Sequence, residues 1–87
     1  MYALDISAVL DKKLSKLRKK NKTQLEIINK KVQQILQTPY HFKPLCGDMH
    51  GEREVHIDSH FVLTYEIDEE KKIVRLLDYD HHDAIFG

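Results

Sequence analysis

The sequence predicts an α+β fold in which two N-terminal antiparallel helices pack on a mostly antiparallel sheet of about four strands, in the order β-α-α-β-β-β. Apolar residues recur at helical spacing through the first half of the chain, and their period changes to two in the second half. Helices followed by a run of strands are typical of a two-layer α+β sandwich. Because the 87 residues contain no linker long enough to divide domains, we expect residues 1–87 to form a single domain with a thin core.

The first half is expected to contain one short strand and two helices. Residues 2–6 are predicted to form the strand, and Ser7 to cap a first helix that ends in a basic cluster. Thr23 and Glu26 have the spacing of a capping box and predict the start of the second helix, which Pro39 ends. The two-residue break between the helices predicts an antiparallel pair.

The second half is expected to be a loop followed by a three-stranded meander. A three-residue turn between the first two strands keeps apolar and polar faces separate, whereas a two-residue turn would mix them. This register places His56 on the face that the helices leave open, with Val62, Thr64 and Glu66. The third strand is apolar on both faces, which predicts a position inside the sheet. The loop covers residues 38–51, the strands 53–57, 61–67 and 72–79, and the turn 58–60, so that the facing pairs are Ile57–Phe61, Val55–Leu63 and Arg53–Tyr65.

Charge is divided unevenly between the two halves of this neutral chain. Residues 1–38 carry nine Lys or Arg against three Asp or Glu, a net charge of +6, and residues 39–87 carry five against eleven, a net charge of −6. Either the two parts share one solvated surface, or the helices offer a basic face to a polyanion or an acidic partner. All six histidines lie in the acidic part, and histidine titrates near neutral pH, so the second reading places the chemistry there.

Several classes of protein are excluded or disfavoured. One cysteine, Cys46, excludes an intramolecular disulfide framework and a multi-cysteine zinc site. No apolar run approaches the ~18 residues of a membrane helix, and the N-terminus lacks a basic-then-apolar signal, so we expect a cytoplasmic protein without membrane contact. The sequence contains no glycine-rich phosphate loop, nucleophile elbow, zinc-protease helix or C-x-x-C pair.

Histidine is the residue type that remains for chemistry. His56 and His60 end one strand, and His81 and His82 follow the last strand, so antiparallel pairing is expected to bring them to one edge of the sheet. Three readings compete: exposed polar residues, a metal site of histidines and carboxylates for which no spacing matches a known ligand pattern, and general acid–base catalysis on a phosphodiester.

Three segments resemble the RelE/ParE toxin superfamily, and within it the YafQ branch of ribosome-dependent mRNA endoribonucleases. They include the strand motif R-[DE]-x-H-I and the terminal motif H-x-x-[IL]-F-G. The order of elements is similar over essentially the whole chain. The segments are residues 53–61, 61–67 and 82–87, and the loop between helices and meander also has the family's Pro-Leu-x-Gly pattern at Pro44, Leu45 and Gly47.

The resemblance implies a toxin that pairs with an antitoxin, reaches operator DNA only through that antitoxin, and cuts mRNA on the ribosome without a metal or cofactor. In that family the 2′-OH of one nucleotide attacks the adjacent phosphate. His56 and His82 match the two motif histidines, His60 stands where the family has an aspartate, and Lys43 stands near another family histidine. Phe86 matches the terminal aromatic and is expected to stack on a base, although it is equally suited to closing the core.

The residues alone support the same chemistry. RNA cleavage by its own 2′-OH needs a base, an acid, and a cation near the phosphate. His56 on the open face and His82 on an exposed tail are expected to be base and acid, in an order that the sequence leaves open. Lys43 is preferred to Arg53 as the cation, because the register puts Arg53 on the inner face. Arg53 and His81 are further candidates for substrate binding.

Two departures from the family leave an alternative open. The chain is neutral rather than basic, and Asp78, with Asp80 and Asp83 nearby, stands where many relatives have an arginine. Carboxylates there would repel phosphate. The alternative is a non-enzymatic interaction protein, either a ParE-like gyrase inhibitor or a degenerate toxin that acts as a co-repressor with its antitoxin. Whether or not the protein is an enzyme, we expect an antitoxin segment to cover apolar residues of the sheet such as Val62 and Leu76.

Overall fold

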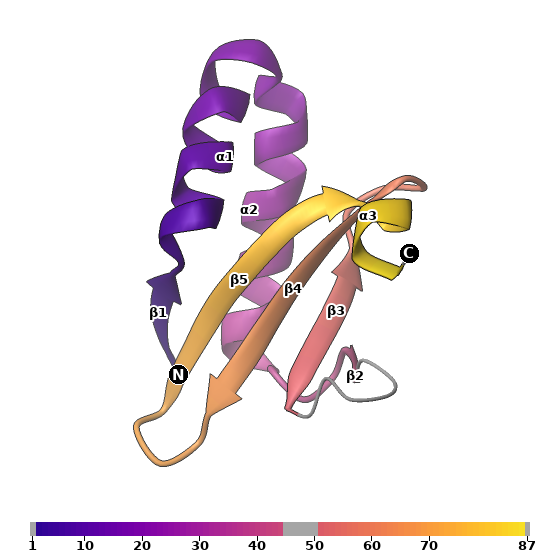
Figure 1. Cartoon of the computed structure of the whole chain (residues 1–87). Coiled ribbons are helices and arrows are strands. Elements are labelled where there is room, and N and C mark those ends of the chain that lie inside the picture. The colour runs from indigo at the N-terminus through magenta and orange to yellow at the C-terminus, as the bar shows by residue number, and fades with distance from the viewer. Residues whose placement is uncertain (1, 45–50, 87) are drawn as a thin grey trace.

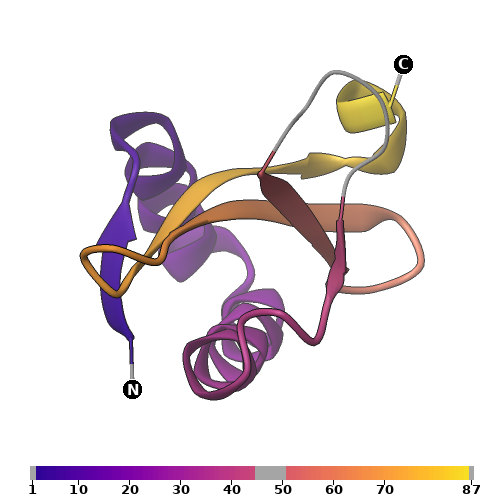
Figure 2. The ribbon, with the colours of Figure 1, turned by 90° about the horizontal axis from the view of Figure 1, so that it is seen from below.

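Two helices cover one face of a five-stranded sheet, and a short third helix lies on the other face (Figures 1 and 2). The computed structural model describes residues 2–44 and 51–86, apart from the side chain of Phe86. The elements are β1 (Ala3–Ile6), α1 (Ala8–Lys20), α2 (Lys22–Gln37), β2 (Lys43–Pro44), β3 (Glu52–His56), β4 (Phe61–Asp68), β5 (Ile73–His81) and α3 (His82–Phe86). The predicted α+β class is confirmed. In the part of the chain so described, no helix is both long and apolar enough to cross a bilayer.

The sheet has the strand order β1-β5-β4-β3-β2, with β1 parallel to β5 and all other neighbours antiparallel. The predicted register is confirmed, because Arg53 faces Tyr65 and Val55 faces Leu63. β5 lies inside the sheet, as predicted. One strand was not expected: β2 falls in the segment predicted as a loop, and it occupies the edge of the sheet, where a proline without an N–H is tolerated.

Asn21 caps both helices. The Ser7 hydroxyl accepts a hydrogen bond from the Leu10 N–H (3.1 Å), so the predicted start of α1 is confirmed. The predicted start of α2 is wrong, since Asn21 rather than Thr23 is its N-cap and accepts from the Gln24 N–H (3.0 Å). Asparagine is as strong an N-cap as threonine or stronger, and the earlier start leaves one residue between the helices.

A bulge near the middle of β5 decides which side chains face the helices. The register slips by one residue between Thr64 and Tyr65, so that Leu77 has no partner on β4. Without this extra residue the alternation would turn Asp78 toward the helices. With it, Tyr79 lies in the core and Asp78 points away from it. The bulge also explains why two apolar residues occur side by side in this strand.

The core lies between the two long helices and the sheet. Tyr65 is fully buried there, and its hydroxyl donates to the Pro39 carbonyl (2.6 Å), while burial raises the pKa of Tyr65 to about 12. The core side chains that are buried almost completely are Leu10, Ile28, Ile35, Leu63, Tyr65, Val74 and Leu76.

The expectation that Val62 and Leu76 need a partner to cover them is wrong. Leu76 belongs to the core beneath the helices. Val62 lies on the other face, where the segment expected to be an exposed tail forms α3 against β4 and β5. The exposed large apolar residues are instead Leu4, Val9 and Tyr40.

At the end of the sheet far from α3, one carboxylate ties three segments together. The hydroxyls of Tyr2 and Tyr40 both donate to Glu69 Oε2 (2.7 Å each), and Lys72 forms an ion pair with Oε1. The Lys72 ammonium, followed by the two hydroxyls, lowers the pKa of Glu69 to about 2. The N-terminal strand, the turn after α2 and the β4–β5 turn therefore share one anchor.

We expect the Glu69→Gln variant to lose less stability in acid than the wild type does. Because the folded pKa of about 2 lies below the ordinary 4.5, the ionised carboxylate stabilises the fold above pH 4.5, and this contribution is lost as the pH falls toward 2. Glutamine cannot take up that proton. Urea unfolding at neutral pH and near pH 3 measures the difference, with Glu70→Gln as the matched control. If the wild type and Glu69→Gln lose the same free energy of unfolding between neutral pH and pH 3, the role of Glu69 is contradicted.

Candidate functional site

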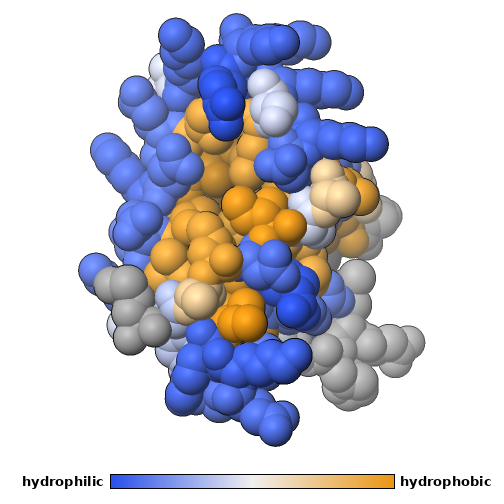
Figure 3. Space-filling view, turned by 90° about the vertical axis from the view of Figure 1, so that its left-hand side faces the viewer, coloured by the Kyte–Doolittle hydropathy of each residue, from blue (hydrophilic) through white to orange (hydrophobic). Residues whose placement is uncertain are grey.

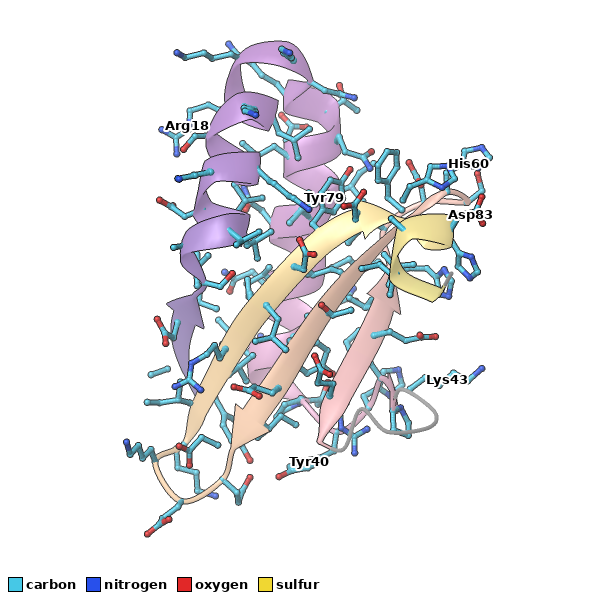
Figure 4. All side chains as sticks on the ribbon, in the orientation of Figure 1. Arg18, Tyr40, Lys43, His60, Tyr79 and Asp83 are labelled. Atoms are coloured by element: carbon cyan, nitrogen blue, oxygen red, sulfur yellow. The ribbon has the colours of Figure 1, made fainter. Side chains whose placement is uncertain are left out.

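Four histidines converge at one end of the sheet, as the sequence predicted. The rings of His56 and His82 stack with centroids 5.9 Å apart and planes at 22°. The rings of His60 and His81 stack at the same separation, with planes at 13°. The His82 N–H donates to the His60 carbonyl (2.7 Å), which joins the β3–β4 turn to the start of α3. In Figure 4, His60 and Asp83 mark this end of the sheet.

The turn that carries His60 is fixed by Asp58. One oxygen of its carboxylate accepts from the N–H groups of His60 and Phe61 (2.8 Å each). Its other oxygen accepts from the buried Gln24 amide of α2 (3.2 Å), which also donates to the Tyr79 hydroxyl (2.8 Å). The hydrogen bond from the His60 N–H is the main cause of the lowered pKa of Asp58. The helix layer therefore holds the turn in place.

His56 lies on the open face beside a buried carboxylate that sequence reasoning missed. Glu54 Oε1 is 3.7 Å from His56 Nε2, and the Glu54 side chain is 8% exposed while that of His56 is 56% exposed. The signal was present, because residues two apart on a strand share a face. Lys43 stands directly opposite Glu54 in β2, so its side chain emerges on the same face and extends from the sheet edge (Figure 4).

His82 begins α3 and is 47% exposed. Asp83 Oδ1 lies 3.8 Å from His82 Nδ1, and Asp83 Oδ2 lies 3.9 Å from His81 Nδ1. Asp83 is the most exposed of these groups, so water screens its charge.

The carboxylates of Asp78 and Asp80 are paired rather than free to repel phosphate. Lys13 of α1, which sequence reasoning also missed, reaches β5 with Nζ at 2.7 Å from Asp78 Oδ1 and 2.9 Å from Asp80 Oδ2. The same ammonium donates to the Tyr79 carbonyl (3.1 Å). The hydrogen bond from Lys13 is the main cause of the lowered pKa of Asp80. The negative charge of the strand end that precedes His81 is therefore partly neutralised by Lys13.

Of the predicted binding residues, Arg53 lies away from this site. The Arg53 guanidinium donates to the carbonyls of Phe42 (2.6 Å) and Tyr40 (3.3 Å) and lies 5.0 Å from the Tyr40 ring centroid. It therefore holds the turn after α2. The backbone of Phe86 ends α3, and its side chain is outside the described residues. Within residues 2–44 and 51–86, no three His, Cys, Asp or Glu side chains are grouped so as to hold a metal ion.

A five-stranded sheet of this order, with two helices on one face and a terminal helix on the other, is the fold of RelE-like toxins. A chain in the crystal structure of the intact E. coli RelBE toxin–antitoxin complex shares this fold, at a TM-score of 0.78. The two chains are 24% identical, and the match covers 91% of this chain and 94% of that chain. The sequence model for the YafQ bacterial toxin of type II toxin–antitoxin systems matches residues 2–87. The chain therefore belongs to the YafQ family of type II toxins, and the predicted resemblance is confirmed.

Two relatives match nearly the whole chain. One is an uncharacterized protein of Methanosarcina mazei, 54% identical over 86 residues that cover 99% of this chain and all of that protein. The other bears the name "Putative toxin RelE4" in Methanocaldococcus jannaschii and is 44% identical over 86 residues, covering 99% of this chain and 92% of that protein.

Proposed function

We propose that this toxin is an endoribonuclease that cleaves mRNA on the ribosome by acid–base catalysis. The observation that carries the proposal is the stacked pair of half-exposed imidazoles, His56 and His82, on the open face of the sheet. Two imidazoles at a separation that one phosphodiester can bridge suit a reaction that needs both a base and an acid, because histidine is the side chain most often used in either role.

In the proposed reaction one imidazole takes the proton of the 2′-OH. The 2′-oxygen then bonds to the adjacent phosphorus, the bond from phosphorus to the 5′-oxygen breaks, and the second imidazole gives its proton to that leaving oxygen. The products are a 2′,3′-cyclic phosphate and a 5′-hydroxyl, so atoms and charges balance without a metal or cofactor. Lys43, which emerges on the same face, supplies positive charge near the phosphate.

Glu54 is expected to orient the His56 imidazole. Its carboxylate oxygen lies 3.7 Å from His56 Nε2 and so limits where that exposed ring can lie, as the carboxylate of a catalytic triad does for its histidine. The Glu54→Gln variant should therefore cleave more slowly than the wild type, with a smaller loss than the ~10²- to 10⁴-fold expected for removal of the histidine itself, and with an unchanged fold. Cleavage of mRNA on ribosomes measures the effect. Glu52→Gln, two residues earlier on the same face, is the matched control, and equal rates for both variants would remove Glu54 from the reaction.

Primer extension on mRNA bound to ribosomes tests the proposed function. The purified protein should cut within the mRNA and leave a 5′-hydroxyl. Cleavage should persist when a chelator selective for transition metals is added in excess Mg²⁺, since the ribosome needs that ion. Loss of cleavage on chelation, with rescue by zinc or manganese, would overturn the metal-free reaction. A well-folded protein that leaves mRNA intact would support the alternative of a non-enzymatic interaction protein.

An antitoxin is the proposed protein partner, through which alone the toxin reaches operator DNA. The RelBE structure contains such a partner for its own toxin. Here Leu4 of β1 and Val9 of α1 are exposed apolar residues beside a lysine-rich helix. These features suit an acidic segment with apolar side chains, which folds on binding. Co-expression with the product of the neighbouring small gene should yield a stable complex without RNase activity. A toxin that stays monomeric and active would contradict the proposal.

A further inference from the structure

A cavity of about 250 Å³ opens between α1 and the adjoining ends of β4 and β5, and neither His56 nor His82 lines it. Its floor is apolar and its rim is basic. The floor consists of Leu17, Phe61 and Tyr79, and the rim of Lys13, Lys16, Lys20 and Asp80. Figure 3 views the side of the molecule that carries α1, where apolar surface is framed by hydrophilic side chains.

Among the described residues, two of the lysines at the rim are not neutralised by a carboxylate. Lys13 is occupied by the carboxylates of Asp78 and Asp80. Lys16 and Lys20 are four residues apart and so share one face of α1, and in the described part of the chain neither forms an ion pair. Two uncompensated ammonium groups at the mouth of an apolar cavity favour a ligand that combines an apolar body with negative charge.

A row of aromatic rings joins this cavity to the histidine site. The Phe61 ring stacks on Tyr79 at 5.1 Å and meets the edge of His81 at 5.5 Å, and His81 in turn stacks on His60. His81 directly precedes His82 of the proposed catalytic pair. Lysines beside a succession of rings are the arrangement by which proteins bind single-stranded nucleic acid, because bases stack on rings and phosphates contact cations.

We propose that the cavity binds one unstacked base of the RNA substrate, next to the cleaved bond, with its neighbouring phosphates on Lys16 and Lys20. The proposal rests on the proposed function, since it extends the path of the RNA beyond His56 and His82. A volume of about 250 Å³ lies below the ~300–1,000 Å³ of ordinary ligand pockets and suits one ring. The continuous row of rings favours RNA over an acidic protein segment, because bases stack on aromatic rings whereas acidic side chains do not.

Binding of an RNA oligonucleotide with a 2′-deoxy nucleotide at the cleaved position tests the proposal without any chemistry. Fluorescence anisotropy gives its affinity as a function of salt for the wild type and for Lys16→Gln/Lys20→Gln. Each cation–phosphate contact on a single strand contributes about 0.7 to the slope of log K against log salt, so the double variant should have a slope shallower by about 1.4. Lys30→Gln/Lys31→Gln, which makes the same change of charge on α2, should keep the wild-type slope.

Abasic nucleotides placed one position at a time identify the bound base. An abasic change at one position flanking the cleaved bond should lower the affinity of the RNA by about 5- to 150-fold, the usual range for a stacked base.

Three results would each overturn the proposal: uniform effects of abasic changes along the RNA, equal slopes for the two double variants, or no RNA binding by the wild type at low salt. So would a Lys16→Gln/Lys20→Gln protein that loses antitoxin affinity and keeps RNA affinity, which would assign the cavity to the protein partner. Cleavage on ribosomes is measured separately, so failure of the proposed function is distinguishable.

Discussion

The His56→Ala and His82→Ala variants are each expected to lose about 10²- to 10⁴-fold in mRNA cleavage while they keep their fold, the usual loss when a general acid or base is removed. Their side chains are 56% and 47% exposed. Truncating an exposed side chain normally changes the free energy of unfolding by no more than about 0.5 kcal/mol. Cleavage rate and stability should therefore respond very differently, and thermal melts beside ribosome assays measure both.

The double variant gives a sharper test. When an acid and a base act in the same transition state, removing the second costs little once the first is gone. We therefore expect His56→Ala/His82→Ala to cleave about as slowly as the slower single variant. His41→Ala, which removes an exposed histidine from the turn after α2, should keep full activity. A stable His82→Ala protein with undiminished cleavage would remove His82 from the reaction, and one that melts many degrees lower would make it structural.

Alternation along two strands was sufficient to place His56. A slip of one residue would have turned every side chain of the strand to the other face, so the pairing of Val55 with Leu63 allowed one register. The same alternation contained Glu54, which shares the open face with His56. It escaped notice because a glutamate in a strand that is polar on one face is expected to be solvated, whereas here it is buried.

Other contacts of the site could not be predicted from local pattern. The bulge at Leu77 reverses the alternation of β5 and so decides that Tyr79 packs beneath the helices while Asp78 stays outside. Lys13 and Asp78 are 65 residues apart. A long lysine side chain on a helix can reach several neighbours, so its partner depends on how the helix lies against the sheet rather than on its own sequence context.

Replacing Lys13 with glutamine is expected to lower stability by about 1–2 kcal/mol. Its ammonium contacts Asp78, Asp80 and the Tyr79 carbonyl, so the change leaves two carboxylates close together without a cation. Hydrogen bonds to charged groups contribute about 1.5–3 kcal/mol, and the smaller figure expected here reflects side chains that are 33–41% exposed to water. Because the Lys13 hydrogen bond lowers the pKa of Asp80, the part of this stabilisation that involves Asp80 is present above its ordinary pKa of 3.8 and is lost as the pH falls below that value.

The same variant should also cleave RNA more slowly, because Asp78 and Asp80 precede His81 and would now repel the phosphates of the substrate. Salt screens such repulsion, so the ratio of wild-type to variant rate should approach one as ionic strength rises. Lys12→Gln makes the same change of charge at the preceding residue and should cleave RNA at the wild-type rate. Lys13→Gln combined with Asp78→Asn and Asp80→Asn removes the uncompensated charge, and it should recover cleavage if Lys13 acts through the two carboxylates. A triple variant as slow as Lys13→Gln would show instead that the lysine itself meets the RNA.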